Sequence, residues 1–249
     1  MLLPRYNYGR RRSLFTPLLY VGCGASVLGL CAAAAVVALL VLPNPQGFAL
    51  QVMGFRSAGQ TETLFADQTA RPAPVLAQPV PVSQIILNIP QVGQQAVTID
   101  GERIQAATGL DPQTAQTVLQ AQTNEAGLLS LCQQYSSLCA EGNGQVRGVR
   151  FDLRPNGLIV SGEVLIPALN TWQPVGIVFQ QVGRRLGVVG VDVNGLLLVD
   201  PPAPYNALIS EAEQAVNTLI GTLSASVDGT AYSVQDMFLD HDLLTLILR

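Results

Sequence analysis

One stretch of the sequence limits what this chain can fold into more than any other: 17–42, an apolar run of 26 residues without a charge. The core of a bilayer is about 30 Å thick and needs about 20 residues of helix, so the run is long enough to span it. Three arginines at 10–12 precede the run, and Arg56 is the first charge after it. Cytoplasmic flanks carry the excess of arginine, so the sequence predicts a single-pass protein of the cell membrane with a cytoplasmic tail, residues 1–16.

Three other interpretations of this run stay open. Ala32–Ala35 offers a small-residue cleavage site for a signal peptide, although the apolar residues continue through Leu42. Cys23 follows a sequence similar to a lipid-attachment box, in which Tyr20 fits poorly. The run could also be a buried helix of a soluble protein. In the transmembrane interpretation, Cys23 and Cys31 lie in the membrane as small apolar residues.

The chain after this run predicts a spacer and then one folded domain. Residues 43–81 are rich in proline and read as a juxtamembrane segment and a semi-rigid tether. Within them, 48–65 suggests irregular chain, with a short hairpin at the membrane surface as the alternative. Residues 82–249 are long enough for one extracytoplasmic domain with its own core.

Charge and composition exclude several classes of function. After residue 42, nine arginines stand against seventeen acidic residues, a net charge of about −8. Affinity for nucleic acid depends on basic side chains that contact phosphates, so we expect no nucleic-acid partner. The chain has no lysine, which excludes Schiff-base chemistry and phosphate loops that need a lysine.

The domain itself shows both helical and strand periodicity. Asp111 and Pro112 are a good helix start, and apolar residues continue at helical spacing to Leu138, with a break or kink at Gly127. Between 145 and 199 the period changes to two, which predicts an antiparallel meander of about five strands. We therefore predict an α+β domain, in which a curved antiparallel sheet carries helices packed on one face, preceded by the transmembrane helix.

Two cysteines lie outside the apolar run, Cys132 and Cys139. Extracytoplasmic compartments are generally oxidising, so the pair suggests a disulfide. Seven residues of continuous helix rise about 10 Å, farther than a disulfide reaches, so the helix has to end between the two cysteines. The alternative is a pair of separate buried thiols.

A search for catalytic residues finds little. His241 is the one histidine, and it stands between Asp240 and Asp242 without a nucleophile-elbow motif elsewhere. Neither CxxC nor HExxH is present, so no metal site is expected. Gly187 and Gly190 lie within a strand and do not form a phosphate loop. We expect neither enzymatic activity nor a cofactor.

The C-terminal half resembles a known class of envelope proteins. The features that carry the resemblance are the strands 158–166 and 175–193, the Asn194-Gly195 hairpin, the helix 207–223 and a last strand with Leu243–Leu246. In this order they are similar to the bacterial LmeA-like lipid binders, which are related to the tubular lipid-binding superfamily. The resemblance implies a long helix against a curved antiparallel sheet, with a lipid chain in the groove between them.

The residues alone leave two interpretations of this region open. An apolar sheet face and an apolar helix stripe form either an ordinary core or an incompletely filled groove that holds an acyl chain. The groove candidates are Val160, Val164, Ile177, Phe179, Val189, Leu208, Ala212, Val216 and Leu219. Trp172, the only tryptophan, is expected at a hairpin tip, where it could contact a membrane or a partner, or fold back onto the core. The functions that remain are lipid or hydrophobe binding and a ligand-free scaffold in a membrane complex.

The predicted orientation can be tested directly. Reporter fusions should place residue 249 outside the cytoplasm and residue 1 inside it, because the arginine excess precedes the apolar run. Neutral replacements of Arg10, Arg11 and Arg12 together should weaken this orientation. A cytoplasmic C-terminus in the unmodified chain would contradict the prediction.

Overall fold

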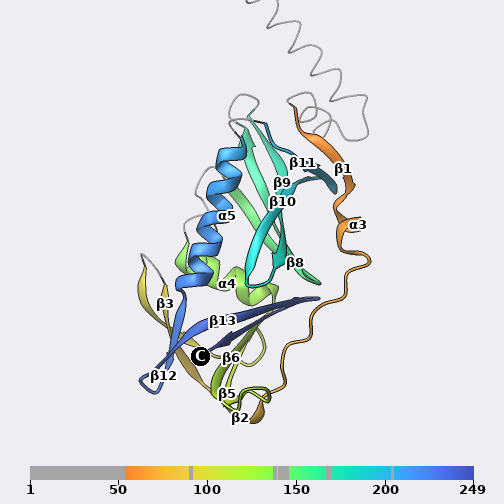
Figure 1. Cartoon of the computed structure of the whole chain (residues 1–249). Coiled ribbons are helices and arrows are strands. Elements are labelled where there is room, and N and C mark those ends of the chain that lie inside the picture. The colour runs from red at the N-terminus through yellow and green to blue at the C-terminus, as the bar shows by residue number, and fades with distance from the viewer. Residues whose placement is uncertain (1–53, 90–91, 137–138, 140–145, 167–169, 203–204) are drawn as a thin grey trace, which may run out of the picture. The chain divides into compact units, whose positions relative to one another are not determined.

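Alternating apolar and polar residues make most of this chain a β-sheet protein. The structure is a computed structural model that describes residues 54–89, 92–136, 139, 146–166, 170–202 and 205–249. Of these residues, 56% lie in strands and 18% in helices. They form two antiparallel sheets (Figure 1), so the prediction of an α+β domain with one curved sheet is wrong. The described residues belong to one compact unit, residues 50–249.

The first sheet has six strands. Their spatial order is β1 (Arg56–Gln60), β11 (Leu196–Val199), β10 (Arg185–Val193), β9 (Thr171–Val182), β8 (Gly157–Ile166) and β7 (Val146–Arg154). Strands β7 to β11 follow one another in the chain, which confirms the meander that the period-two alternation predicts. Asn194 and Gly195 connect β10 to β11 with φ angles of 54° and 81°. This tight turn needs positive φ at both positions, which asparagine and glycine tolerate.

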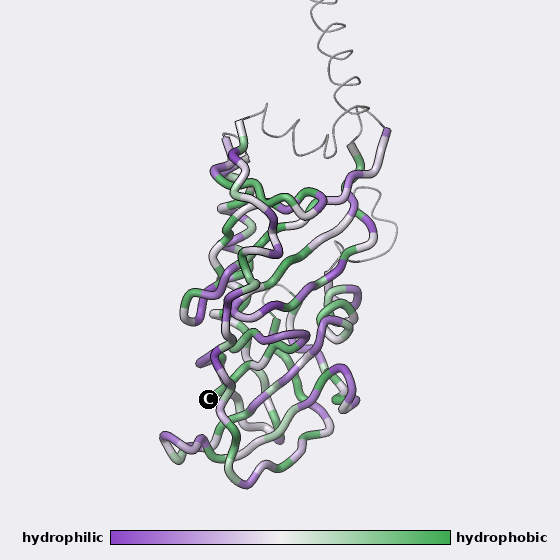
Figure 2. The backbone as a smooth tube through the Cα atoms, turned by 90° about the vertical axis from the view of Figure 1, so that its right-hand side faces the viewer, coloured by the Kyte–Doolittle hydropathy of each residue, from purple (hydrophilic) through white to green (hydrophobic). Residues whose placement is uncertain are grey.

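The second sheet has eight strands. Their spatial order is β2 (Ala77–Pro81), β5 (Ile104–Leu110), β6 (Thr117–Thr123), β14 (Leu243–Leu248), β13 (Thr230–Asp240), β12 (Ser224–Val227), β3 (Gln84–Ile89) and β4 (Gly93–Thr98). The sheet curls into a half-barrel. Its interior is a core that Ile85, Val97, Leu119 and Leu248 share across the strands. Figure 2 shows apolar stretches along strands of both sheets.

In the described part of the chain three helices accompany the sheets: α3 (Thr61–Phe65), α4 (Glu125–Tyr135) and α5 (Tyr205–Thr222). Helix α5 confirms the predicted C-terminal helix. The helix predicted from Asp111 starts instead at Glu125, because residues 117–123 pair with strands on both sides and form β6. Gly127 does not break α4. A Cβ atom there would lie 2.6 Å from the carbonyl oxygen of Arg103, so glycine lets the helix approach that loop closely.

Cys132 and Cys139 form the predicted disulfide, with their Cα atoms 5.5 Å apart. Helix α4 ends at Tyr135 and is capped by Ser136, so the chain turns between the two cysteines as the geometry requires. Tyr135 packs on the core of the half-barrel. The disulfide therefore fixes the chain that leaves α4 next to this core.

The predicted tether contributes a strand to each sheet, β1 from Arg56 and β2 from Ala77. β1 and β2 pair with β11 and β5, so the folded region begins before the boundary that we expected near Val82. Between these strands, the guanidinium of Arg71 lies 4.1 Å from the ring centre of Phe238 and 2.6 Å from a carboxylate oxygen of Asp236. Leu76 is buried beside Val118. The proline-rich segment therefore lines the outside of the eight-stranded sheet.

The predicted transmembrane helix, 17–42, and the tail, 1–16, lie outside the described residues. Within residues 54–249, as far as the structure describes them, no helix combines the length and the apolar character needed to cross a membrane.

One core joins the two sheets and both longer helices. Strand β13 contributes Met237 and Leu239, which are 2% and 1% exposed, and the six-stranded sheet contributes Leu153, Phe179 and Leu186. The turn between β7 and β8 reaches the same strand, because the Asn156 N–H donates to the Leu239 carbonyl at 3.1 Å. In Figure 1, β13 crosses below the ends of β8 to β10. We refer to this cluster as the junction core.

The opposite surface of the six-stranded sheet is covered by α3. Phe65, 5% exposed, packs with Val178 and Leu197. Its ring lies directly over Gly157, where a Cβ atom would be 2.1 Å from a ring carbon. A side chain at residue 157 and the phenyl ring therefore exclude each other.

Gly157→Ala should consequently destabilise the fold. Overpacking of this kind costs about 1 to 3 kcal/mol, to be measured as the free energy of unfolding in denaturant. Gly187→Ala is the control, because the nearest atom to its Cβ is 3.9 Å away. Gly157→Ala should cost much less unfolding free energy when residue 65 is already alanine. A double-mutant cycle with Phe65→Ala measures this coupling. Equal effects of Gly157→Ala and Gly187→Ala would contradict this account.

Candidate functional site

The strand period gives the six-stranded sheet two distinct surfaces. Leu158 opposes Phe179 and Val160 opposes Ile177 on the surface that continues into the junction core. We call this surface the inner face. Ile159 lies on the opposite, outer face, which α3 covers. Both surfaces are apolar because something packs on each of them.

Along β8 and β9, exposure on the inner face rises away from β13. Phe179 and Leu186, both 3% exposed, are buried in the junction core. One pair farther along, Val160 and Ile177 are only half-buried, and Val164 near the end of β8 is 37% exposed. On β10 and β11 the same face is buried, because Phe55 packs on Val193 and Leu198. The inner face is therefore incompletely covered only on the β8–β9 side.

Helix α5 lies along one side of this face (Figure 1). Val216 and Ile220 pack into the junction core, and Ala212 is half-buried. Leu219, predicted to face the sheet, is 43% exposed because it lies about 100° around the helix from Ile220. The side chain of Leu208 lies outside the described residues.

Val189 does not belong to the inner face either. It packs with Val178 and Phe65 on the outer face. Simple alternation fails here because β10 has a bulge between Val188 and Gly190, which shifts the period of the residues that follow. Sequence periodicity alone does not locate such a shift.

Polar side chains of α5 hold the helix to the exposed edge of β10. Strand β10 pairs with β9 along one edge. Along its other edge, β11 pairs only with residues 191–193, so the backbone of residues 185–188 faces α5 there. Asn217 Oδ1 accepts from the Leu186 N–H at 2.9 Å, and Asn217 Nδ2 donates to the Leu186 carbonyl at 2.8 Å. The Glu213 carboxylate accepts from the Val188 N–H at 2.9 Å. These contacts replace the missing strand.

Glu213 and Asn217 face β10, while Val216 and Ile220 of the apolar stripe face the junction core. The sequence feature that could have indicated this contact is the spacing of four residues between Glu213 and Asn217, next to the apolar stripe. Polar residues at this spacing are common on exposed helix surfaces, so the signal alone does not identify an edge contact.

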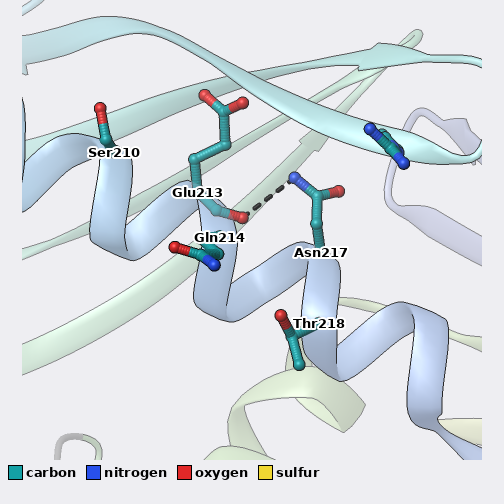
Figure 3. A pocket seen from close by; sticks show the side chains of 6 residues that line it. Ser210, Glu213, Gln214, Asn217 and Thr218 are labelled. Carbon is teal, nitrogen blue, oxygen red and sulfur yellow. Dashed lines mark hydrogen bonds between the residues drawn. The ribbon is translucent and has the colours of Figure 1, made fainter.

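A polar pocket of about 430 Å³ opens beside these contacts (Figure 3). Its lining residues are Arg185, Ser210, Glu213, Gln214, Asn217 and Thr218. Two of these side chains already bond to β10. Asn217 Nδ2 also donates to the backbone oxygen of Glu213 at 2.9 Å. The pocket is thus the mouth of the seam between α5 and β10, and the side chains that line it are polar or charged.

Trp172 lies at the far end of β9 and is half-buried. The guanidinium of Arg147 stacks over its ring at 4.2 Å, and Arg147 also pairs with Glu163 at 2.5 Å. Trp172 opposes Leu165 of β8, on the outer face. The tryptophan is therefore neither fully exposed nor part of the junction core.

The described residues hold no group of three or more metal-binding side chains. His241 lies in the exposed turn between β13 and β14, and its N–H donates to the Asp240 carboxylate at 2.7 Å. The most distinctive surface is thus apolar, and it is the partly covered inner face.

Asn217→Ala should loosen the seam between α5 and β10. It leaves the N–H and carbonyl of Leu186 without their described partners, which costs about 1 to 3 kcal/mol of unfolding free energy. Hydrogen exchange of the Leu186 amide should accelerate. Gln214→Ala, on the exposed pocket wall, is the matched control and should cost less than about 0.5 kcal/mol. Unchanged exchange at Leu186 in the Asn217 variant would contradict the assignment.

The inner face, the seam and the polar pocket make up the described geometry. Comparison of the chain with protein families, with curated proteins and with solved structures finds no match. Support for a function comes from the chemistry of these surfaces.

Proposed function

We propose that the domain binds a lipid or another hydrophobic molecule on the inner face of its six-stranded sheet, alongside α5, without catalysing a reaction. The observation that supports this best is the incomplete cover over Val160, Ile177 and Val164. Apolar residues between a sheet and a helix are normally buried, since burial is favourable by about 25 cal/mol per Å². An acyl chain along this face would supply the missing cover.

The geometry favours an elongated ligand. The buried end of the face, at Phe179 and Leu186, closes it at the junction core. The other end carries Val164, 37% exposed, and opens towards solvent. A ligand with an apolar chain and a polar end would fit this gradient, with the chain against Val160 and Ile177.

The resemblance to LmeA-like and tubular lipid-binding proteins leads to the same proposal. That resemblance implies a long helix against a curved sheet with a lipid chain between them; in this chain α5 is bonded to the edge of β10, and the proposed ligand lies on the sheet face beside it. We further propose that the apolar run 17–42 holds the protein at the cell membrane, with the domain on the extracytoplasmic side. The disulfide between Cys132 and Cys139 is compatible with an oxidising compartment.

Trp172 is the proposed contact with a membrane or a partner. Its indole is half-buried beside Arg147, a combination suited to an interface between apolar and charged surroundings. Adding lipid vesicles to the purified chain should then shift the emission of this single tryptophan to the blue.

A ligand-free scaffold in a membrane complex is the second candidate. The observation that favours it is the junction core, in which Leu153, Met237 and Leu239 are fully packed. In that case the half-buried part of the inner face would be covered by a partner protein instead of a lipid.

Native mass spectrometry of the full chain, purified in detergent, distinguishes the two candidates. The wild-type protein should carry the additional mass of a co-purified lipid. Val160→Trp should lose most of this mass, because the indole occupies the space of the chain. Val182→Trp, at a 70% exposed position at the end of β9, should retain it.

Thermal melts of both variants give the control for folding. Loss of lipid from a Val160→Trp protein that melts like the Val182→Trp protein supports binding on the inner face. No lipid on the wild-type protein would instead favour the scaffold.

A further inference from the structure

The edges of the two sheets differ in how they are protected. An edge strand presents unpaired N–H and C=O groups, to which another chain can add a strand. Among the described residues, the edge strands are β1 and β7 in the first sheet and β2 and β4 in the second. Natural edge strands are usually blocked by prolines, charges, bulges or a covering element. Three of these four carry such features.

Two of the protected edges are short and irregular. β2 contains Pro79 and Pro81, which lack an N–H to donate, and its pairing shifts between Ala77 and Val80. β1 has five residues, and its pairing shifts between Ser57 and Gly59. Neither strand presents a regular row of hydrogen-bonding groups.

The third protected edge, β7, is covered and charged. It carries three arginines and a bulge between Arg147 and Arg150. At Leu153 the N–H donates to the carboxylate of Glu125 in α4 at 2.7 Å. The carbonyl of Leu153 accepts from the Asp242 N–H at 3.4 Å. A further strand could not pair along this edge without breaking these contacts.

Among the described residues, β4 shows none of these protections. Six consecutive pairs join it to β3 without a bulge, from Gln84 opposite Thr98 to Ile89 opposite Gly93. Its sequence, GQQAVT, contains neither a proline nor a charge. Figure 1 shows the hairpin of β3 and β4 at the margin of the sheet. On the surface away from the half-barrel core, every residue of β4 is exposed.

A row of facing residues leads to this edge and ends in two apolar side chains. Ala96 of β4 opposes Ile86 of β3, which is 42% exposed although it is a large aliphatic side chain. Ile86 in turn opposes Ser226 of β12, and Ser226 opposes Ala231 of β13. The row thus runs across four strands, and its apolar part, Ile86 and Ala96, stops where the sheet ends.

No described element covers β4, and we propose that a second copy of this chain adds its β4 to this edge, antiparallel, so that the two sheets continue into one. Residues directly opposite each other in an antiparallel pair point to the same surface, so a two-fold axis can pass through Ala96. Ala96 then opposes its own copy, Gln94 opposes Thr98, and Gln95 opposes Val97. No like charges meet, because β4 carries none.

The second copy is favoured over an unrelated strand because it extends the apolar part of this row. Pairing through Ala96 places Ile86, Ala96 and their two counterparts in one line across the axis. Each exposed Ile86 then belongs to a continuous apolar strip. The contact area of one edge strand is small, so we expect weak, concentration-dependent association.

Charge variants at the axis test this inference on the full chain in detergent, with the protein mass measured by light scattering. Ala96→Lys and Ala96→Glu each place like charges opposite each other, and each should weaken self-association about tenfold or more. Ala96 is exposed, so neither charge is buried in the monomer. An equimolar mixture of the two variants should associate at least as well as the wild type.

The matched control is Ala231→Lys, in the same row but three strands from the edge, which should leave association unchanged. A wild-type protein that is monomeric at every concentration up to its solubility limit would overturn the inference. So would variants that associate like the wild type, or a mixture that fails to restore association. Thermal melts identify any variant that does not fold, and each charge variant tests the inference on its own if the other is tolerated poorly.

Discussion

The packing of β13 against the ends of β7 to β10 holds the described fold together. Met237 and Leu239 supply the buried β13 side chains against which Leu153 and Phe179 of the six-stranded sheet pack, and Val216 of α5 joins the same cluster. Antiparallel sheets need one covered face to be stable, and here a strand of one sheet supplies cover for the other. β13 can do this because it is long and its two halves pair with different strands. Its first residues pair with β12, and after the irregularity between Val234 and Asp236 its remaining residues pair with β14.

A second constraint is the satisfaction of backbone groups where strands stop. Buried N–H and C=O groups need partners, and this chain provides them from helices as well as from strands. Glu125 in α4 serves β7, and Glu213 and Asn217 in α5 serve β10. Each helix therefore does two things: its apolar side packs in a core, and its polar side completes a sheet. This explains why α5 lies at the side of the inner face and leaves part of that face only half-buried.

The sequence predicts the parts of this fold that depend on neighbouring residues. The meander, the Asn194-Gly195 turn, α5 and the disulfide all follow from period, turn chemistry or spacing. The two-sheet arrangement does not, because pairing between β1 and β11 or between β6 and β14 joins segments far apart in the chain. Residues 117–123 have a helical apolar spacing, but pairing on both sides overrides it. At the candidate site, the residues that lie on the inner face or against it, as the pattern predicts, are Val160, Ile177, Phe179 and Val216. Val189 lies on the outer face because of the bulge in β10, and Leu219 is exposed because it lies on another side of α5.

The position of β1 has a mechanical consequence. A pull on the chain from its N-terminal side reaches the described fold first at Phe55, which is buried against Val193 and Leu198. It then reaches β1, which is held by a few bonds to β11 and by an exposed ion pair between Arg56 and Asp200. The next attachment is Thr61, which bonds to Asp192 and to the Gly195 carbonyl. Only after these would force reach Arg71 and the eight-stranded sheet. Because the load meets these attachments one after another, β1 can detach while the junction core stays intact, and the domain would lengthen under tension before it unfolds.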